Sequence, residues 1–161
     1  MLDRVPNDQL LHADNILTDY FRVPVRGRGV IRDRFGRKRR SFAVEMMGSW
    51  VGDVYVLREE FHFDNGELQQ RSWTLRFTDD THFEAVCPET VGRARGEVNR
   101  GDVHTRYVFR VKIGGRLIAL RFDDRIHFLD EGAAINVAVM RKFGIRVAEL
   151  VLCMKRIGPD S

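Results

Sequence analysis

Turn residues recur about every ten positions along most of this chain, and this spacing is the feature that most limits its fold. Gly and Asn-Gly pairs separate segments that are rich in β-branched and aromatic residues. Short connections of this kind join antiparallel strands, because a parallel crossover needs a dozen residues or more. The pattern predicts an all-β antiparallel meander of about ten strands that closes into a barrel or sandwich. The strands are expected near residues 23–34, 38–48, 53–63, 67–78, 81–87, 93–100, 103–113, 116–129, 133–141 and 145–156.

The first twenty residues are the part of the chain with a helical pattern. Asn7 or Asp8 is expected to cap a short helix that reaches Leu17. The 161 residues contain no linker or low-complexity segment. One domain of residues 1–161 is therefore expected, with a helical segment at 1–20 and the barrel at 21–157.

Composition and charge exclude several classes of protein. Hydrophobic residues make up 43% of the chain and charged residues 31%, which is typical of a folded globular domain and not of a disordered or collagen-like chain. No apolar run approaches the roughly 20 residues that a membrane-spanning helix requires. The first residues lack the basic and then apolar pattern of a secretory signal, so a cytoplasmic location is expected.

Neither the cysteines nor the histidines are arranged as in a metal site. Cys87 and Cys153 form no Cys-x-x-Cys motif, and the five histidines are scattered. Both thiols are expected to be buried or half-buried. The chain also lacks the phosphate-binding loops and nucleophile motifs of common enzyme families. No metal, cofactor or catalytic residue is therefore predicted.

Two registers are possible for the hairpin whose loop contains Gly66. A two-residue turn would set apolar residues opposite polar ones. A three-residue loop, with Gly66 in the left-handed region, gathers the apolar residues on one face instead. The second register is preferred, and it pairs Glu59 with Arg71 and Leu57 with Trp73.

The hairpin around Gly114-Gly115 has a simpler register. Glycine adopts positive φ without a steric penalty, so these two residues suit a two-residue turn. The resulting cross-strand pairs are Val111–Ile118, Phe109–Leu120, Tyr107–Phe122 and Thr105–Asp124.

Charged residues therefore lie among aromatic residues on the inward faces of both hairpins. A buried charge needs a partner, because an unpaired one costs several kcal/mol. Glu59 and Arg71 are expected to pair, and Asp124 is expected to take its donor from Tyr107, Thr105 or an arginine. The alternative is a salt bridge that merely fixes the register. The candidate ligand-binding residues are Tyr55, Leu57, Glu59, Phe61, Arg71, Trp73, Tyr107, Phe109, Phe122 and Asp124, with Leu75 and Leu120 beside them.

A basic run spans the first expected hairpin. Its residues are expected to form an exposed patch: Arg26, Arg28, Arg32, Arg34, Lys38 and Arg40. Such a patch suits anionic headgroups of a membrane surface, unless acidic residues on neighbouring strands balance it. The net charge of +4 permits either reading. No nucleic-acid partner is expected, because no aromatic residues alternate with the arginines.

Several segments together resemble a family of uncharacterised bacterial proteins, many of them lipoproteins, that carry a domain-of-unknown-function label. The resemblance extends from about Tyr20 to Arg156. It implies a calycin-like barrel, similar to the lipocalins and fatty-acid-binding proteins, with an inner cavity. The segments are Leu57-Arg58-Glu59-Glu60-Phe61, Asp64-Asn65-Gly66-Glu67, Arg71-Ser72-Trp73, Val91-Gly92-Arg93-Ala94-Arg95-Gly96, Phe122-Asp123-Asp124, Asn136, Met140 and Lys142-Phe143-Gly144.

The sequence departs from that family at two points. Arg125 follows the paired aspartates where the family often has an aromatic residue, and no lipoprotein signal with its lipid-attachment cysteine is seen. The letters of Gly48-Ser49-Trp50 match the lipocalin Gly-x-Trp motif. They follow the second expected strand, however, and not the start of the first, so the match is interpreted as a coincidence.

Three functions remain open at this stage. The leading hypothesis is a binding protein for a small hydrophobic molecule of the fatty-acyl or isoprenoid type. The alternatives are an enzyme that acts on a lipid with a carboxylate as acid or base, and a peripheral module that binds anionic membranes through the arginine patch. The oligomeric state is left open, because nothing in the pattern bears on it.

Overall fold

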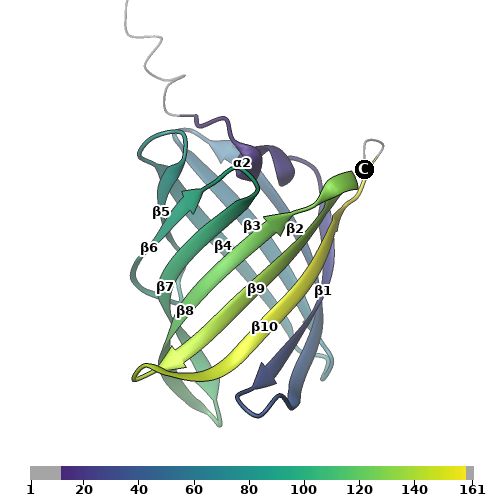
Figure 1. Cartoon of the computed structure of the whole chain (residues 1–161), viewed down its shortest axis with the longest axis vertical. Coiled ribbons are helices and arrows are strands. Elements are labelled where there is room, and N and C mark those ends of the chain that lie inside the picture. Colours follow the sequence, from purple (N-terminus) through teal and green to yellow (C-terminus); the bar gives the residue numbers. More distant parts are fainter. Residues whose placement is uncertain (1–11, 159–161) are drawn as a thin grey trace, which may run out of the picture.

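The computed structural model describes residues 12–158, which form a closed antiparallel barrel with one short α-helix (Figure 1). The all-β prediction is confirmed. The helix is α2 (Ile16–Tyr20), and the turn η1 (Asp130–Gly132) is a single 3₁₀ turn. The strands are β1 (Val25–Asp33), β2 (Lys38–Val51), β3 (Val54–Phe63), β4 (Leu68–Phe77), β5 (His82–Val86), β6 (Thr90–Val98), β7 (Asp102–Ile113), β8 (Arg116–Phe128), β9 (Ala133–Lys142) and β10 (Ile145–Arg156).

Each strand pairs with its neighbours in the sequence, and β1 pairs with β10 to close the ring. Both predicted hairpin registers are confirmed. Glu59 lies opposite Arg71, and Gly66 has a φ of 87°, as the bulged loop requires. Thr105 lies opposite Asp124 across the Gly114-Gly115 turn. These registers bring the charged residues of both hairpins to the inside of the barrel.

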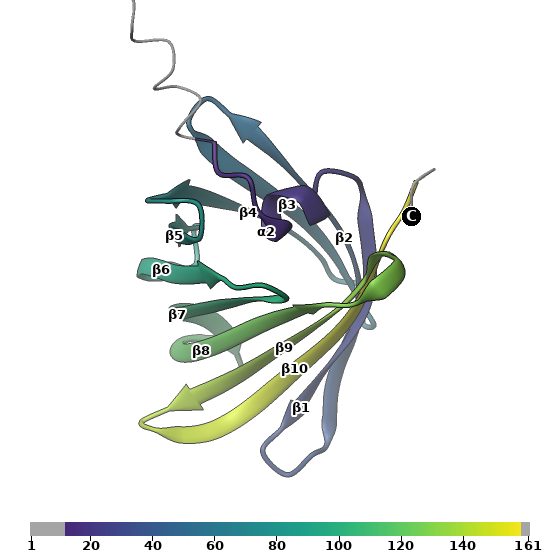
Figure 2. The ribbon, with the colours of Figure 1, turned by 45° about the horizontal axis from the view of Figure 1, so that its top comes forward.

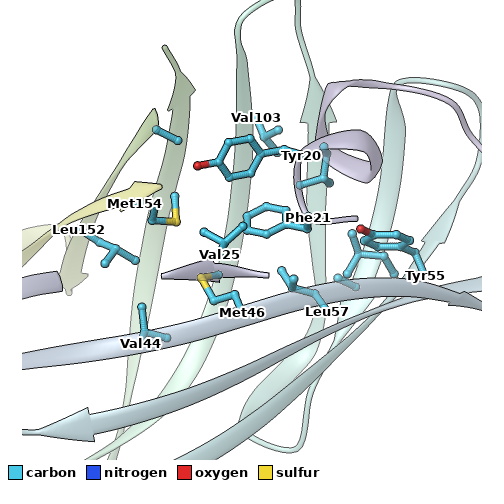
Figure 3. Packing of buried hydrophobic residues seen from close by; sticks show 14 of the residues in the cluster. Tyr20, Phe21, Val25, Val44, Met46, Tyr55, Leu57, Val103, Leu152 and Met154 are labelled. Carbon is cyan, nitrogen blue, oxygen red and sulfur yellow. The ribbon is translucent and has the colours of Figure 1, made fainter. Parts of the chain in front are cut away.

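The helix α2 covers one end of the barrel, called the closed end below (Figures 1 and 2). The Asn15 side chain accepts a hydrogen bond from the Thr18 amide at 3.0 Å and caps α2. The expected caps at residues 7 and 8 lie outside the described residues. Leu17, Tyr20 and Phe21 are buried against the strands, as Figure 3 shows for the last two. This packing fills the closed end of the barrel.

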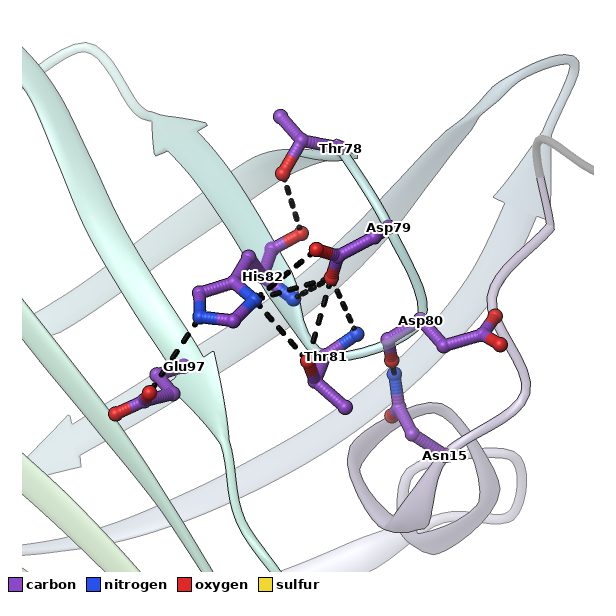
Figure 4. A network of polar contacts seen from close by, with 7 residues as sticks. All are labelled: Asn15, Thr78, Asp79, Asp80, Thr81, His82 and Glu97. Atoms are coloured by element: carbon purple, nitrogen blue, oxygen red, sulfur yellow. Dashed lines mark hydrogen bonds and ion pairs between the residues drawn. The ribbon is translucent and has the colours of Figure 1, made fainter.

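A polar network holds the β4–β5 turn next to α2 (Figure 4). The side-chain amide of Asn15 donates a hydrogen bond to the backbone carbonyl of Asp80 at 2.8 Å. Asp79 accepts hydrogen bonds from the backbone amides of Thr81 and His82 and contacts the His82 imidazole, and these interactions lower its pKa to about 2. The neighbouring Asp79 carboxylate, together with that of Glu97, raises the pKa of His82. The network therefore ties the helix to the strand turns around it.

The opposite end of the barrel, called the mouth, consists of five strand connections. Because the strands alternate in direction, every second connection lies at the same end (Figure 1). The connections of the mouth are residues 34–37, 64–67, 87–89, 114–115 and 143–144.

The structure corrects two local expectations. Gly48-Ser49-Trp50 lies inside β2, because this strand continues to Val51. A side chain at Gly48 would collide with the Tyr55 ring, so this glycine allows close packing beneath α2. Cys87 is buried, but Cys153 is exposed, since it lies on the outward face of β10.

Candidate functional site

The barrel encloses a cavity of about 830 Å³. Its lining extends from Leu17, on the inner side of α2, to Gly114 and Leu117 at the mouth. Leu117 is strongly exposed, so the cavity reaches the surface at the mouth. The barrel is therefore packed at one end and accessible from the other.

Aromatic side chains form much of the cavity wall. Trp73 contacts Tyr107 edge-to-face with 5.2 Å between ring centroids, and Tyr107 stacks on Phe122 at 5.0 Å. Phe109 stacks on Trp73 at 5.9 Å. These rings come from β4, β7 and β8 and meet because the two hairpin registers turn them inward. They form an apolar surface suited to the body of a hydrophobic molecule.

Arg71 lies in the cavity without a complete set of partners. Its guanidinium carbon is 4.9 Å from the Phe61 ring centroid and 4.8 Å from that of Phe109. Its contacts with carboxylates are long, at 3.9 Å to Glu59 and 3.7 Å to Glu89. Its Nη2 group donates a long hydrogen bond to the Gln69 side-chain oxygen at 3.4 Å, and the buried Nε makes no hydrogen bond. Arg71 therefore has donor capacity left for a further acceptor in the cavity.

Glu59 is a buried carboxyl group whose charge is only weakly stabilised. Its side chain is 10% exposed. Burial raises the pKa of Glu59 to about 7, although the nearby Arg71 charge acts in the opposite direction, and Asp124 raises it further. Near neutral pH, Glu59 therefore exchanges between a neutral acid and a carboxylate.

Asp124 has better hydrogen bonding than Glu59. It accepts a hydrogen bond from the Tyr107 hydroxyl at 2.8 Å and a short one from the Asn136 amide. Burial raises the pKa of Asp124 despite these two donors. Burial and the neighbouring Asp124 also hold the pKa of Tyr107 well above its usual value. The three residues form a polar cluster on the wall formed by β7, β8 and β9.

Nine of the ten candidate ligand-binding residues line the cavity, and Tyr55 does not. The Tyr55 side chain is 1% exposed and packs beneath α2, where its hydroxyl donates to the Thr18 carbonyl at 3.3 Å. The alternation of side chains along β3 correctly predicts that Tyr55 points inward, but α2 covers Tyr55 and separates it from the cavity. The residues that line the cavity are Leu57, Glu59, Phe61, Arg71, Trp73, Tyr107, Phe109, Phe122 and Asp124.

Asn136 is a polar residue of the cavity wall that is missing from the sequence-based candidates. It lies on β9 between the inward-facing residues Ala134 and Ala138. A polar residue at an inward position of an otherwise apolar strand is the signal that identifies it. The side-chain amide of Asn136 donates to the backbone carbonyl of Arg125 at 2.8 Å as well as to Asp124. These two hydrogen bonds fix the orientation of the amide.

The arginine patch is less uniform than the sequence predicts. Arg26 and Arg28 are exposed on the outer face of β1, and Arg26 pairs with Glu45 at 3.1 Å. Arg34 lies in the turn after β1 and not on the strand.

Lys38 and Arg40 do not share a face with each other. A bulge in β2 separates them, because Lys38 pairs with Arg32 while Arg40 pairs with Ile31. The Arg40 guanidinium carbon lies 3.7 Å above the centroid of the Phe63 ring, at the mouth of the cavity. Arg40 therefore belongs to the cavity lining and not to an outward patch, while Arg32 contributes to both.

Other kinds of site have less support within residues 12–158. No group of three potential metal-binding side chains occurs there. None of the helices in this part of the chain has the length and apolar character needed to cross a membrane.

The fold and its cavity define the class of protein. A closed antiparallel barrel with a cavity inside is the architecture of the lipocalin-like, or calycin-like, proteins. The chain belongs to the family described as "Protein of unknown function (DUF3833)", whose model matches residues 9–156. No curated protein sequence matches at a significant level.

Two solved structures share the fold. The S-type phycobiliprotein lyase CPES from Guillardia theta superimposes with a TM-score of 0.67 at 8% sequence identity, covering 94% of this chain and 97% of that one. Rv2717c from M. tuberculosis superimposes with a TM-score of 0.61 at 14% identity, covering 90% of this chain and 100% of that one. At these identities the comparisons establish the barrel fold and leave the ligand to the chemistry of the cavity.

Proposed function

We propose that this protein binds a small, largely hydrophobic molecule in the barrel cavity. The observation that carries the proposal is a cavity of about 830 Å³ that combines aromatic walls with the incompletely paired Arg71. Ligand sites in proteins commonly have volumes of about 300–1,000 Å³, and a few polar groups in them orient the ligand. The cavity has the size and the mixture of surfaces that such binding needs.

The polar end of the ligand is assigned to Arg71. Its Nε has no hydrogen-bond partner, and both carboxylates near it are beyond hydrogen-bond distance. A carboxylate or similar acceptor on the ligand would accept hydrogen bonds from the guanidinium group, in the way that arginine binds carboxylates elsewhere. An acyl or isoprenoid chain with such an end group would lie along the aromatic wall of Trp73 and Phe109.

Glu59 would make the binding of an anionic ligand depend on pH. Below a pH of about 7 the Glu59 carboxyl is neutral and does not repel an anion near Arg71. Above that pH it is charged, so the affinity for an anionic ligand should fall as pH rises through about 7. A neutral ligand should show no such loss. A pH titration of the affinity therefore reports the charge of the ligand.

The test is native mass spectrometry of the purified protein followed by titration with an environment-sensitive fatty-acid probe. Ala138→Phe should weaken probe binding, because Ala138 lines the cavity and the added ring fills it. Val137→Phe is the matched control, since Val137 does not line the cavity. Equal probe binding by both variants, once each is shown to be folded, would remove the cavity from the proposal.

The contribution of Arg71 has its own matched control. Arg71→Gln should weaken the binding of an anionic probe, whereas Arg58→Gln should not, because Arg58 is exposed on the outer face of β3. Identical affinities for the two variants would show that Arg71 does not hold the polar end of the probe.

Catalysis on a bound lipid is a second candidate function. Glu59 and Asp124 both have raised pKa values within one cavity, which is a property of carboxyl groups that act as acids or bases. Asp124→Asn should then abolish the conversion of a bound lipid and leave its binding intact. A lipid extract whose mass spectrum is unchanged after incubation with the wild-type protein would leave binding as the function.

A further inference from the structure

The two ends of the barrel carry opposite charge. Ten basic and four acidic residues lie at the mouth, a formal excess of +6. Six basic and nine acidic residues lie at the closed end, a formal excess of −3. Each end is counted over its connections and two strand residues on either side, which are residues 32–39, 62–69, 85–91, 112–117 and 141–146 at the mouth and residues 12–26, 50–55, 76–83, 97–103, 127–134 and 155–158 at the closed end. Such a distribution turns the mouth toward an anionic surface.

Exposed apolar side chains are concentrated at the same end. Eight large apolar side chains among residues 12–158 are more than half exposed, and six of them lie at the mouth. The most exposed are Phe143 at 90%, Phe35 at 69% and Leu117 at 69%. They lie on the hairpins β1–β2, β7–β8 and β9–β10, which are neighbours in the barrel and form one side of its mouth. Isolated exposed apolar residues are ordinary, but a group of them at one end marks an interaction surface.

Phe143 is unfavourable for the turn that it occupies. It has a φ of 52°, in the left-handed region that bulky side chains avoid and that Asn or Gly adopts easily. Its side chain is almost fully exposed, so packing within the barrel does not compensate for this backbone conformation. A residue that violates a local preference without a gain for folding points to a role outside the barrel.

Basic groups lie next to both exposed rings. The Arg34 guanidinium carbon is 4.7 Å from the Phe35 ring centroid, and the Lys142 ammonium nitrogen is 5.0 Å from that of Phe143. A ring flanked by cations suits the boundary of a lipid bilayer, where the ring enters the acyl region and the cations contact phosphates. The exposed aliphatic residues Leu117 and Ile113 fit such a boundary better than they fit nucleic acid, which offers phosphates and stacked bases.

We propose that the mouth docks on an anionic lipid membrane, with Phe35 and Phe143 inserted into it. The opposite charges of the two ends orient the barrel with its mouth toward the membrane. The exposed apolar side chains of the hairpin tips then hold the barrel at the membrane surface. Docking in this orientation places the cavity opening directly on the bilayer, so a lipid would pass between membrane and cavity without crossing water. The proposal goes beyond ligand binding and does not depend on it, because docking needs only the surface of the mouth.

The test is flotation of the full chain with vesicles of phosphatidylcholine, with or without about one third phosphatidylglycerol. Binding should require the anionic lipid and decrease at high salt, because salt screens surface charges. The double variant Phe35→Ser, Phe143→Ser should lose at least about ten-fold in affinity, which corresponds to the burial of one or two large apolar side chains. The matched control is Val51→Ser, Leu129→Ser at the closed end, where both residues are about half exposed, and it should bind like the wild type.

A single change separates docking from folding. Phe143→Asn places a residue that tolerates the left-handed region in the same turn, so its unfolding temperature should equal or exceed that of the wild type. Its vesicle binding should nevertheless decrease. A lower unfolding temperature with unchanged vesicle binding would assign Phe143 to folding and contradict the proposal.

Three further outcomes would overturn the proposal. These are no binding to anionic vesicles, equal loss of binding in the mouth and closed-end variants, and salt-dependent binding to an oligonucleotide without binding to vesicles. The last result would assign the charge of the mouth to nucleic acid instead.

Discussion

Replacing Glu59 by Gln should change how the stability of the barrel depends on pH. The pKa of Glu59 rises from 4.5 in the unfolded chain to about 7 in the folded one. The folded protein therefore binds the proton more tightly, and its stability decreases as pH rises between these two values. The rise from 4.5 to about 7 corresponds to about 3 kcal/mol of unfolding free energy. Gln resembles the neutral acid and lacks this loss.

Urea unfolding at about pH 4 and about pH 8 measures the effect. Between these values the wild type should lose about 3 kcal/mol more than Glu59→Gln. His82 also has a raised pKa, but Asp79 and Glu97 cause it in both proteins, so its contribution cancels in the difference. Asp124 helps to raise the pKa of Glu59, so the difference includes the repulsion between these two carboxylates. Glu60→Gln is the control, because Glu60 is on the outer face and its pKa is lowered. If the wild type and Glu59→Gln differ in unfolding free energy by the same amount at both pH values, Glu59 is not a destabilised buried carboxylate.

Three more predictions address other parts of the molecule. Trp73→Ala should reduce the affinity for a fatty-acid probe more than Arg32→Ala does, because only Trp73 belongs to the aromatic wall. Fluorescence titration measures both affinities, and an equal reduction would contradict the prediction. Iodoacetamide at about pH 8 should label Cys153 much faster than Cys87, whose burial raises its pKa to about 12, as peptide mass mapping would show. Gly66→Ala should cost about 1–2 kcal/mol of unfolding free energy because of its φ of 87°, and an unchanged melting temperature would disprove this.

The sequence predicts the registers of the two hairpins because turn chemistry and side-chain pattern agree there. Gly66 and the Gly114-Gly115 pair each limit their turn to a few geometries. The apolar residues then select the register that places them on one face. Pairing of Glu59 with Arg71 follows from these local facts alone, without knowledge of the rest of the barrel.

Depth inside the barrel cannot be predicted in the same way. Alternation shows that Tyr55 points inward, but only the position of α2 determines that it lies in packed protein and not in the cavity. The face of Arg40 depends on a one-residue bulge for which the sequence has no glycine signal. The role of Asn136 depends on a partner, Asp124, that only the pairing of β8 with β9 brings close.

The pairing of β1 with β10 has a consequence for how the chain folds. The residues that it joins lie more than about 100 positions apart in the sequence, so the ring forms only after a long loop has closed. Until β10 is available, β1 and β9 each keep an unpaired edge, to which another chain can add a strand. During synthesis β1 cannot form its pairing with β10 until β10 has been made. This protein should accordingly fold slowly, aggregate most readily before β10 has left the ribosome, and tolerate loss of its last strand worse than a change in any single turn.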